Sequence, residues 1–257
     1  KTNKERDEFI LKKLKLIPTF NNFIPGVILD LQPLRVDVLL KNGKKISVYK
    51  RGLKLLKKDL ELQNEGEKLL KPGSVIRFVK KRNYWIATQL PEVESSLVSM
   101  DPQTGAILAL VGGFDFHRNK YNHVSQANRQ PGSIFKPFIY SAALEKGITP
   151  ATLVNDAPIY ITAKELNTNE NWEPQNYNEK YDGAIRLRQG LAKSKNLVAI
   201  RVLKHIDPKY ALDYITRFGF DKKKHSPYLS MALGGGQVTA LEMFVAYDGF
   251  ADGEYHK

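Results

Sequence analysis

The first third of the chain has hydrophobic positions spaced as in β-strands. Val36, Val38 and Leu40 lie at every second position up to Asn42-Gly43, and the spacing of two resumes beyond that pair. Asn-Gly between two alternating segments is a strong signal for a β-hairpin. A similar pattern predicts strands at 75–79 and 84–88 around a turn at 81–83. About five short strands in some seventy residues predict a small β-barrel that resembles an OB-fold.

The rest of the first third is more polar. Residues 1–18 predict a charged helix that ends before Pro18, because proline restricts the residue before it. The Lys/Leu/Glu-rich stretch 53–70 predicts a loop with a helical turn, and residues 91–94 predict a linker. We therefore place a helical segment at 1–22, the OB-like barrel at 23–90 and a second domain at 91–257.

Helical periodicity dominates after the linker. Only 96–100 and 106–111 have strand character, and they predict a hairpin around the Asp-Pro-Gln-Thr-Gly turn at 101–105. Segment 151–184 predicts irregular structure, and Thr239-Ala-Leu-Glu242 predicts a capping box that opens a last helix to about residue 251. The other helices are predicted at 133–146, 187–193, 197–205 and 208–218. The whole pattern indicates an α+β fold, with helices around an antiparallel sheet, preceded by the small barrel.

Charge separates the two parts. Residues 1–90 hold 21 of the 40 Lys and Arg residues but only 9 of the 27 Asp and Glu residues, whereas residues 91–257 are nearly neutral. The basic barrel favours an anionic partner such as phospholipid, wall polymer or nucleic acid, or it is a solvated lysine-rich surface. Its aromatic residues alternate along strands and are predicted to be core residues, which disfavours nucleic acid; they are Tyr49, Phe78, Tyr84 and Trp85.

Composition excludes several classes of chemistry. The chain has no cysteine, so thiol catalysis and disulfides are excluded. Its five histidines lack the spacing of metal ligands, so we predict no metal site. The longest apolar run, 106–111, is too short to span a membrane. Gly234-Gly-Gly236 does not follow the pattern of a phosphate-binding loop and predicts a flexible turn.

The most informative stretch is Arg-Gln-Pro-Gly-Ser-Ile-Phe-Lys-Pro-Phe at 129–138. Ser133 and Lys136 are three residues apart at the predicted start of a helix, which places both side chains on one face. A lysine amine beside a serine hydroxyl can activate the serine without a histidine. The helix N-terminus favours the negative charge that develops as the serine attacks a carbonyl group. This segment predicts acyl transfer by an activated serine.

A second element follows at Ser194-Lys-Asn196, and S-x-x-K followed by S-x-N is the pattern of penicillin-recognising serine enzymes. Together with segments 97–113, 140–147, 172–177 and 187–197, this pattern resembles the transpeptidase part of class A (bifunctional) penicillin-binding proteins. The similarity is strong over 91–257 and looser over 20–90. In that family a barrel of this kind lies ahead of the catalytic core.

The resemblance implies a role for each matching residue. Ser133 would be the nucleophile, Lys136 its base, and Ser194 a proton relay to the leaving amine. Asn196 would bind the substrate backbone, and the Ser133 N–H would be one oxyanion donor. Trp172 would border the substrate cleft, or else anchor the irregular 151–184 segment in the core. Lys193 and Lys195 are predicted to face solvent.

The sequence departs from the family in what it lacks. No K-T-G or K-S-G follows Asn196, and no glycosyltransferase domain precedes the barrel. We therefore expect an internal fragment of a longer protein, which by itself binds β-lactams poorly. The parent is expected to cross-link stem peptides ending in D-Ala-D-Ala, without a cofactor, at the periplasmic face of the inner membrane, where an anchor outside this chain would hold it.

Two alternatives remain open at this point. One is a hydrolase of the same fold, such as a carboxypeptidase or a β-lactamase, although the class A β-lactamase pattern has Asp where Lys195 stands here. The other is a non-catalytic module in which the basic barrel binds a regulator, a lipid or nucleic acid. Salt-dependent binding by residues 20–90 would separate the barrel's possible ligands.

Overall fold

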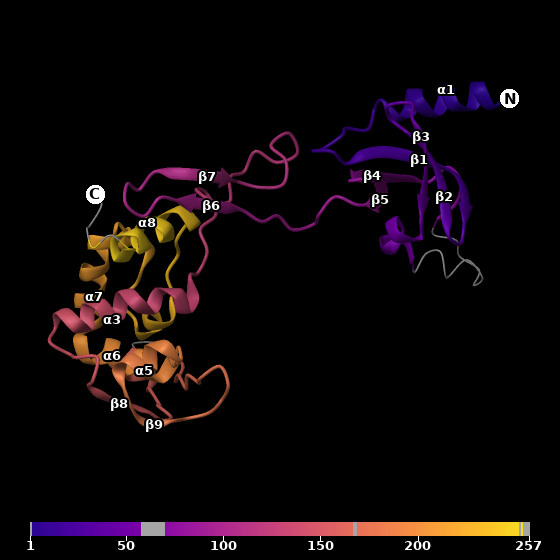
Figure 1. The fold of residues 1–257 in the computed structure, drawn as a ribbon. Coiled ribbons are helices and arrows are strands. Elements are labelled where there is room, and N and C mark those ends of the chain that lie inside the picture. Colours follow the sequence, from indigo (N-terminus) through magenta and orange to yellow (C-terminus); the bar gives the residue numbers. More distant parts are fainter. Residues whose placement is uncertain (1, 58–69, 167–168, 252, 254–257) are drawn as a thin grey trace. The chain divides into compact units, whose positions relative to one another are not determined.

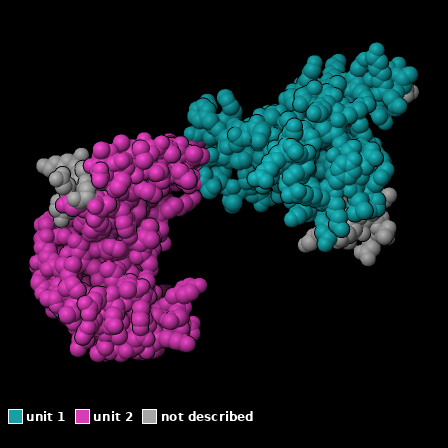
Figure 2. Space-filling model, viewed as in Figure 1, with its two compact units in different colours: residues 1–95, 113–120 teal, residues 96–112, 121–257 magenta. Residues whose placement is uncertain are grey.

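The computed structural model describes residues 2–57, 70–166, 169–251 and 253. The chain forms two compact units, which are coloured separately in Figure 2. The barrel unit comprises residues 1–95 and 113–120, and the helical unit comprises residues 96–112 and 121–257. Each unit has its own hydrophobic core.

The barrel unit is built on one five-stranded antiparallel sheet with the strand order β3-β2-β1-β4-β5. The end strands β3 and β5 also contact each other, so the sheet closes on itself as in a small Greek-key barrel. The strands are β1 (Ile24–Gln32), β2 (Arg35–Leu40), β3 (Lys45–Tyr49), β4 (Val75–Lys81) and β5 (Tyr84–Thr88). The predicted OB-like strands are confirmed, and the predicted stretch 53–70 lies largely outside the described residues.

The alternation in the sequence becomes the inside and outside of the barrel. Val36 and Val38 of β2 are buried with Phe78 of β4, while Asp37 between the two valines points away and pairs with Arg35. The hairpin between β2 and β3 turns at Gly43, whose φ of 84° lies in the left-handed region that glycine adopts without a steric penalty. The predicted Asn-Gly turn is therefore confirmed.

The four barrel aromatics have different environments. Phe78 lies in the core, and Trp85 packs partly against it. Tyr84 is half-buried under the guanidinium group of Arg51, and Tyr49 is exposed. The prediction of core residues thus holds for Phe78 and in part for Trp85, but it was wrong for Tyr49.

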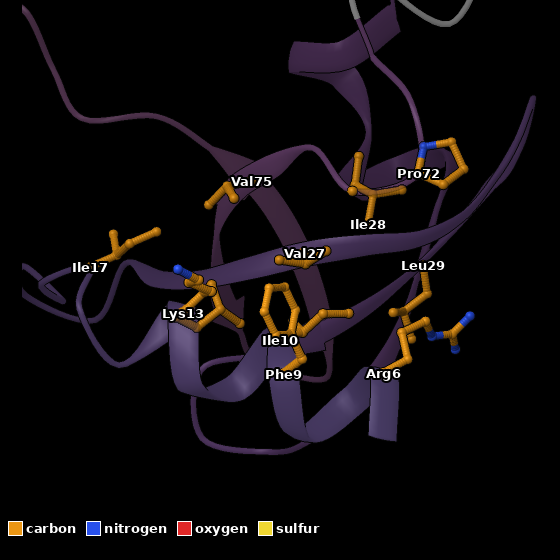
Figure 3. A pocket seen from close by; sticks show the side chains of 12 residues that line it. Arg6, Phe9, Ile10, Lys13, Ile17, Val27, Ile28, Leu29, Pro72 and Val75 are labelled. Carbon is orange, nitrogen blue, oxygen red and sulfur yellow. The ribbon is translucent and has the colours of Figure 1, made fainter. Parts of the chain in front are cut away.

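Helix α1 (Asn3–Leu14) opens the barrel unit. Its first turn is closed by a capping box in which Glu5 and Thr2 bond reciprocally. The helix is shorter than predicted, because the chain tightens into turns after Leu14. Figure 3 shows a pocket between α1 and strands β1 and β4, into which Phe9, Ile10 and other apolar side chains project.

The helical unit contains two short two-stranded sheets and a bundle of helices (Figure 1). Its strands are β6 (Leu97–Met100), β7 (Ile107–Val111), β8 (Leu153–Asp156) and β9 (Gly183–Arg186). Its α-helices are α3 (Lys136–Glu145), α4 (Ala163–Leu166), α5 (Leu187–Ala192), α6 (Asn196–Ile206), α7 (Pro208–Ile215) and α8 (Ala240–Ala251). Its 3₁₀ helices are η4 (Gly132–Phe135), η5 (Thr216–Phe218), η6 (Lys222–Lys224) and η7 (Leu229–Leu233). The α+β prediction is confirmed.

The core of this unit lies between α3 and α6, which pack against each other. An aromatic cluster extends the core from α3, where Phe138 contacts Phe218 and Phe220 edge to face. Edge-to-face contacts of this kind add stability beyond the burial of apolar area. The packing of α3 on α6 in this core therefore fixes the starts of the two helices relative to each other.

Of the two small sheets in this unit, one was predicted from the sequence and the other was not. β6 and β7 form the predicted hairpin, and every residue of β7 is exposed. Segment 151–184 is more regular than predicted, because β8 pairs antiparallel with β9, which begins inside that segment at Gly183. The pairing was missed because each strand has only four residues. Among the described residues, no helix is long and apolar enough to cross a membrane.

Candidate active site

Ser133 lies in a tight turn at the entrance to α3. The predicted helix start is a 3₁₀ turn, Gly132–Phe135, which passes directly into the α-helix at Lys136. Ser133 is exposed, whereas Phe135 and Lys136 are buried. Gly132 has a φ of 63°, a conformation that favours glycine, so the Pro-Gly pair sets the direction in which the turn enters the helix. The serine thus faces solvent above a buried lysine.

The Lys136 amine is held by three oxygen atoms of the turn at 194–196. Its Nζ donates to the Ser194 carbonyl at 2.7 Å, to Ser194 Oγ at 3.1 Å and to Asn196 Oδ1 at 2.7 Å. Within the described parts of the chain, the Ser133 hydroxyl is not among these acceptors. The structure therefore brings Lys136, Ser194 and Asn196 together, as the two sequence patterns predicted, with Ser133 one turn away along the chain.

The environment of Lys136 favours a neutral amine. The side chain is only 1% exposed, and its three acceptors are a carbonyl, a hydroxyl and an amide oxygen, none of them charged. Burial lowers the pKa of Lys136 from 10.5 to about 8 because the charged form loses hydration. An amine with such a pKa is partly neutral near physiological pH, as a general base must be.

Ser194 adopts an unusual backbone conformation. It joins α5 to α6 with a φ of 52°, the left-handed region that is costly for residues other than glycine. The turn is closed by the Lys195 N–H, which donates to the Gly190 carbonyl at 2.8 Å. This conformation lets both the carbonyl and the hydroxyl of Ser194 face Lys136. Strain at a functional position of this kind persists where the surrounding structure enforces it.

The glycine run at 234–236 supports the serine turn from the other side. A Cβ atom on Gly234 would lie 2.3 Å from the Gly132 carbonyl oxygen, which is closer than two non-bonded heavy atoms can approach. A Cβ atom on Gly236 would likewise clash with the ring of His225, which stacks on Phe135. The predicted turn is present, and it is a packing element of the serine turn, which the sequence did not indicate.

Lys195 corrects a prediction, because it is buried rather than solvent-facing. Its side chain is 5% exposed, and its Nζ lies 2.8 Å from Asp156 Oδ2 and 3.3 Å from Asp182 Oδ2. Burial alone would lower the pKa of Lys195, but these two carboxylates raise it. Lys193, in contrast, is exposed as predicted and pairs with Asp182 at the surface.

Asp156 and Asn176 were not recognised from the sequence. Burial would raise the pKa of Asp156, but hydrogen bonds from Asn176, Lys195 and a backbone N–H lower it overall, so the carboxylate is charged. The Asn176 side chain lies 2.7 Å from Asp156 and accepts the Asn196 N–H at 2.9 Å. The only sequence signal was that Asn176 belongs to the 172–177 segment on which the family resemblance partly rests.

Trp172 has a structural role in the 151–184 segment. Its backbone pairs with Ile161 through two hydrogen bonds, and its ring packs partly against the main core. This contact explains how the 151–184 segment is anchored. A role in bordering substrate stays a prediction.

The geometry supports acyl transfer by an activated serine. An exposed hydroxyl, a buried amine with a lowered pKa and a helix start that favours negative charge are the requirements for an activated serine. Within the residues that the structure describes, no group of three or more His, Asp or Glu side chains is placed to hold a metal ion.

Comparisons with known proteins agree with this chemistry. Residues 95–257 match the penicillin binding protein transpeptidase domain, and residues 1–93 match the penicillin-binding protein OB-like domain. The chain is 43% identical to penicillin-binding protein 1A of Neisseria cinerea over 250 residues, which cover 97% of this chain and 31% of that protein. It is 35% identical to penicillin-binding protein 1A of Escherichia coli strain K12, covering 96% and 29%.

A solved structure extends the comparison to the fold. The crystal structure of penicillin-binding protein 1A from Haemophilus influenzae matches with a TM-score of 0.81 at 34% identity, over 95% of this chain and 35% of that chain. The chain thus spans about a third of the length of the relatives that it matches.

Proposed function

This chain belongs to the penicillin-binding proteins, and we propose that its helical unit is part of a peptidoglycan D,D-transpeptidase whose nucleophile is Ser133. The observation that carries the proposal is the Lys136 amine, which is buried under the exposed Ser133 turn and held by Ser194 and Asn196. This cluster supplies a base, a hydroxyl relay and an amide beside one serine.

The reaction begins when Ser133 Oγ attacks the carbonyl carbon of the penultimate residue of a stem peptide ending in D-Ala-D-Ala. The hydroxyl proton passes to neutral Lys136, and the backbone N–H of Ser133 stabilises the oxyanion as one of its donors. The C–N bond then breaks, and Ser194 relays a proton from Lys136 to the departing D-Ala amine. The product is an acyl-enzyme ester on Ser133.

The second half of the reaction runs in the opposite direction. An amine of a neighbouring stem peptide attacks the ester, its proton returns through Ser194 and Lys136, and Ser133 regains its hydrogen as the cross-link forms. Asn196 hydrogen-bonds the substrate backbone during both steps, and Trp172 borders the donor peptide. β-Lactams acylate the same serine, because their strained amide resembles the D-Ala-D-Ala terminus. No cofactor takes part.

The wider setting is also proposed by similarity, since the chain spans about a third of its relatives. The longer protein would add a glycosyltransferase domain, a membrane anchor and the K-T-G strand that completes the site. It would act at the periplasmic face of the inner membrane. Its basic barrel would meet a regulator, and nucleic acid is not among the expected partners.

Intact-mass analysis with a fluorescent penicillin tests the proposal. The 257-residue chain, the full-length protein and the Ser133→Ala variant of each are incubated with the penicillin and weighed. We expect one covalent adduct on the full-length protein, its absence in Ser133→Ala, and little or no adduct on the shorter chain. An adduct that survives in Ser133→Ala, or no adduct on the full-length protein, would contradict the assignment of the nucleophile.

A further inference from the structure

A buried ionic cluster contacts the turn at 194–196 through the side chain of Lys195. Asp156, at the end of β8, is 0% exposed, and it contacts the Nζ of Lys195. Asp182 lies at the partly exposed edge of the cluster. A buried ion pair usually contributes little net stability compared with apolar packing, because both charges lose hydration. Its presence beside a functional turn therefore favours a role in fixing geometry.

Asn176 connects this cluster to the start of α6. Its Nδ2 donates to Asp156 Oδ1 at 2.7 Å and to the Lys180 carbonyl at 2.9 Å. Its Oδ1 accepts the backbone N–H of Asn196 at 2.9 Å and that of Leu197 at 3.4 Å. Because both amide hydrogens are used by acceptors, the orientation of the Asn176 amide group is fixed.

Asn176 thereby supplies a cap that the helix itself lacks. The residue at the N-cap position of α6 is Lys195, whose side chain makes no capping hydrogen bond. The first N–H groups of a helix need acceptors from outside, and here a side chain twenty residues earlier provides one. The position of the first turn of α6 thus depends on a loop from another part of the chain.

The two connections converge on the residues that hold Lys136. Asp156 fixes Lys195 through its side chain, and Asp156 fixes the Asn196 backbone through Asn176. The Asn196 side chain is held in turn, because its Nδ2 donates to the Gln175 carbonyl at 2.9 Å while its Oδ1 accepts from Lys136. The two residues that follow the strained Ser194, Lys195 and Asn196, are therefore both restrained.

We propose that Asp156, Asn176 and Lys195 are positioning residues that hold Ser194 and Asn196 in place around the Lys136 amine. Among the described residues, no hydrogen bond or ion pair joins Ser133 to any of the three, so they act through the turn. The inference rests on the proposed function, since it concerns how the same site is held. A general contribution to folding would change stability alone. This proposal predicts in addition that the ionisation of the Lys136 amine changes when the turn is displaced.

The test measures acylation of the full-length protein by a fluorescent penicillin as a function of pH and penicillin concentration. Asn176→Ala removes the cap without leaving an unpaired Lys195, and Lys195→Met removes the cation. Asn178→Ala is the matched control for the first, because Asn178 lies in the same loop and is exposed. Lys193→Met is the control for the second, because Lys193 also bonds Asp182 but lies at the surface.

We expect Asn176→Ala and Lys195→Met to slow the acylation step at saturating penicillin at least ten-fold at pH 7.5. Because a displaced turn admits water to Lys136, the midpoint of their pH profile should also move upward by half a unit or more. Both controls should match the wild type. Thermal unfolding, followed by circular dichroism, establishes that each variant is folded at the assay temperature.

Wild-type acylation rates and an unchanged pH profile in a folded Asn176→Ala variant would overturn the proposal, even if the variant melts at a lower temperature. If Lys195→Met does not fold, Asn176→Ala alone decides. Acylation that persists in Ser133→Ala would instead refute the proposed function, and the inference with it. The two failures are therefore distinguishable.

Discussion

The lowered pKa of Lys136 predicts how acylation by a penicillin depends on pH. If Lys136 is the base, the rate follows the neutral fraction of its amine. With a pKa of about 8, that fraction rises from about 10% at pH 7 to about 90% at pH 9. We therefore expect a roughly ten-fold increase over this range, which levels off near pH 9. An ordinary lysine would give a roughly hundred-fold increase without levelling.

The assay is the second-order rate of adduct formation between pH 6 and 10 on the full-length protein, corrected for hydrolysis of the penicillin without protein. Lys136→Met is the control, since it lacks the amine and should lose both the rate and its pH dependence. A wild-type rate that stays flat from pH 7 to 9 would refute Lys136 as the base. A rate that keeps rising beyond pH 9.5 would refute the pKa derived from its burial.

The same burial affects stability with a definite sign. The folded-state pKa of Lys136 lies below the unfolded value of 10.5, so between about pH 8 and 10.5 the unfolded chain binds more protons. The contribution of Lys136 to the free energy of unfolding therefore rises with pH across that window and is lowest below pH 8. Between the two ends of the window this contribution changes by about 3 kcal/mol. Comparing the pH dependence of urea unfolding between the wild type and Lys136→Met isolates this contribution.

Three further substitutions test the packing. Phe78→Ala empties the fully buried centre of the barrel and should lower the free energy of unfolding of that unit by about 3–5 kcal/mol, while Ser133 acylation stays within two-fold; a smaller loss would contradict the assigned core. Gly234→Ala places a Cβ against the Gly132 carbonyl, so acylation should fall with stability; an unaffected variant would show that the close approach is unimportant. Thr239→Ala breaks the capping box with Glu242 and should cost about 1 kcal/mol in urea unfolding without slowing acylation.

The barrel and most helices were predictable because their signals are local. The alternation around Asn42-Gly43 requires only neighbouring residues, and it gave the β2–β3 hairpin with its turn in place. The capping box at Thr239 is equally local and is confirmed by two reciprocal hydrogen bonds. The membership of the penicillin-binding protein family, predicted from several short motifs, is confirmed by the family matches over both units.

The contacts that hold the site in place were not predictable, because they join segments that are distant in the sequence. Lys195 has the composition of a surface residue, and only the folded chain reveals Asp156 beside it. Asn176 caps a helix that begins twenty residues later, which no local capping pattern describes. The packing of Gly234 on Gly132 likewise depends on tertiary structure, so the sequence indicated a turn and not its contact.

The long-range origin of the Lys136 contacts has a consequence for the newly made protein. Its acceptors lie 58 and 60 residues further along the chain, so they meet the amine only after α3 and α6 have docked. Before that, Lys136 is hydrated and fully protonated, and Ser133 is an ordinary alcohol. A nascent or unfolding chain is therefore chemically silent toward acyl donors. Reactivity of the full-length protein toward penicillin would report the completed site, and a pulse of label during refolding would give the time by which these two helices have docked.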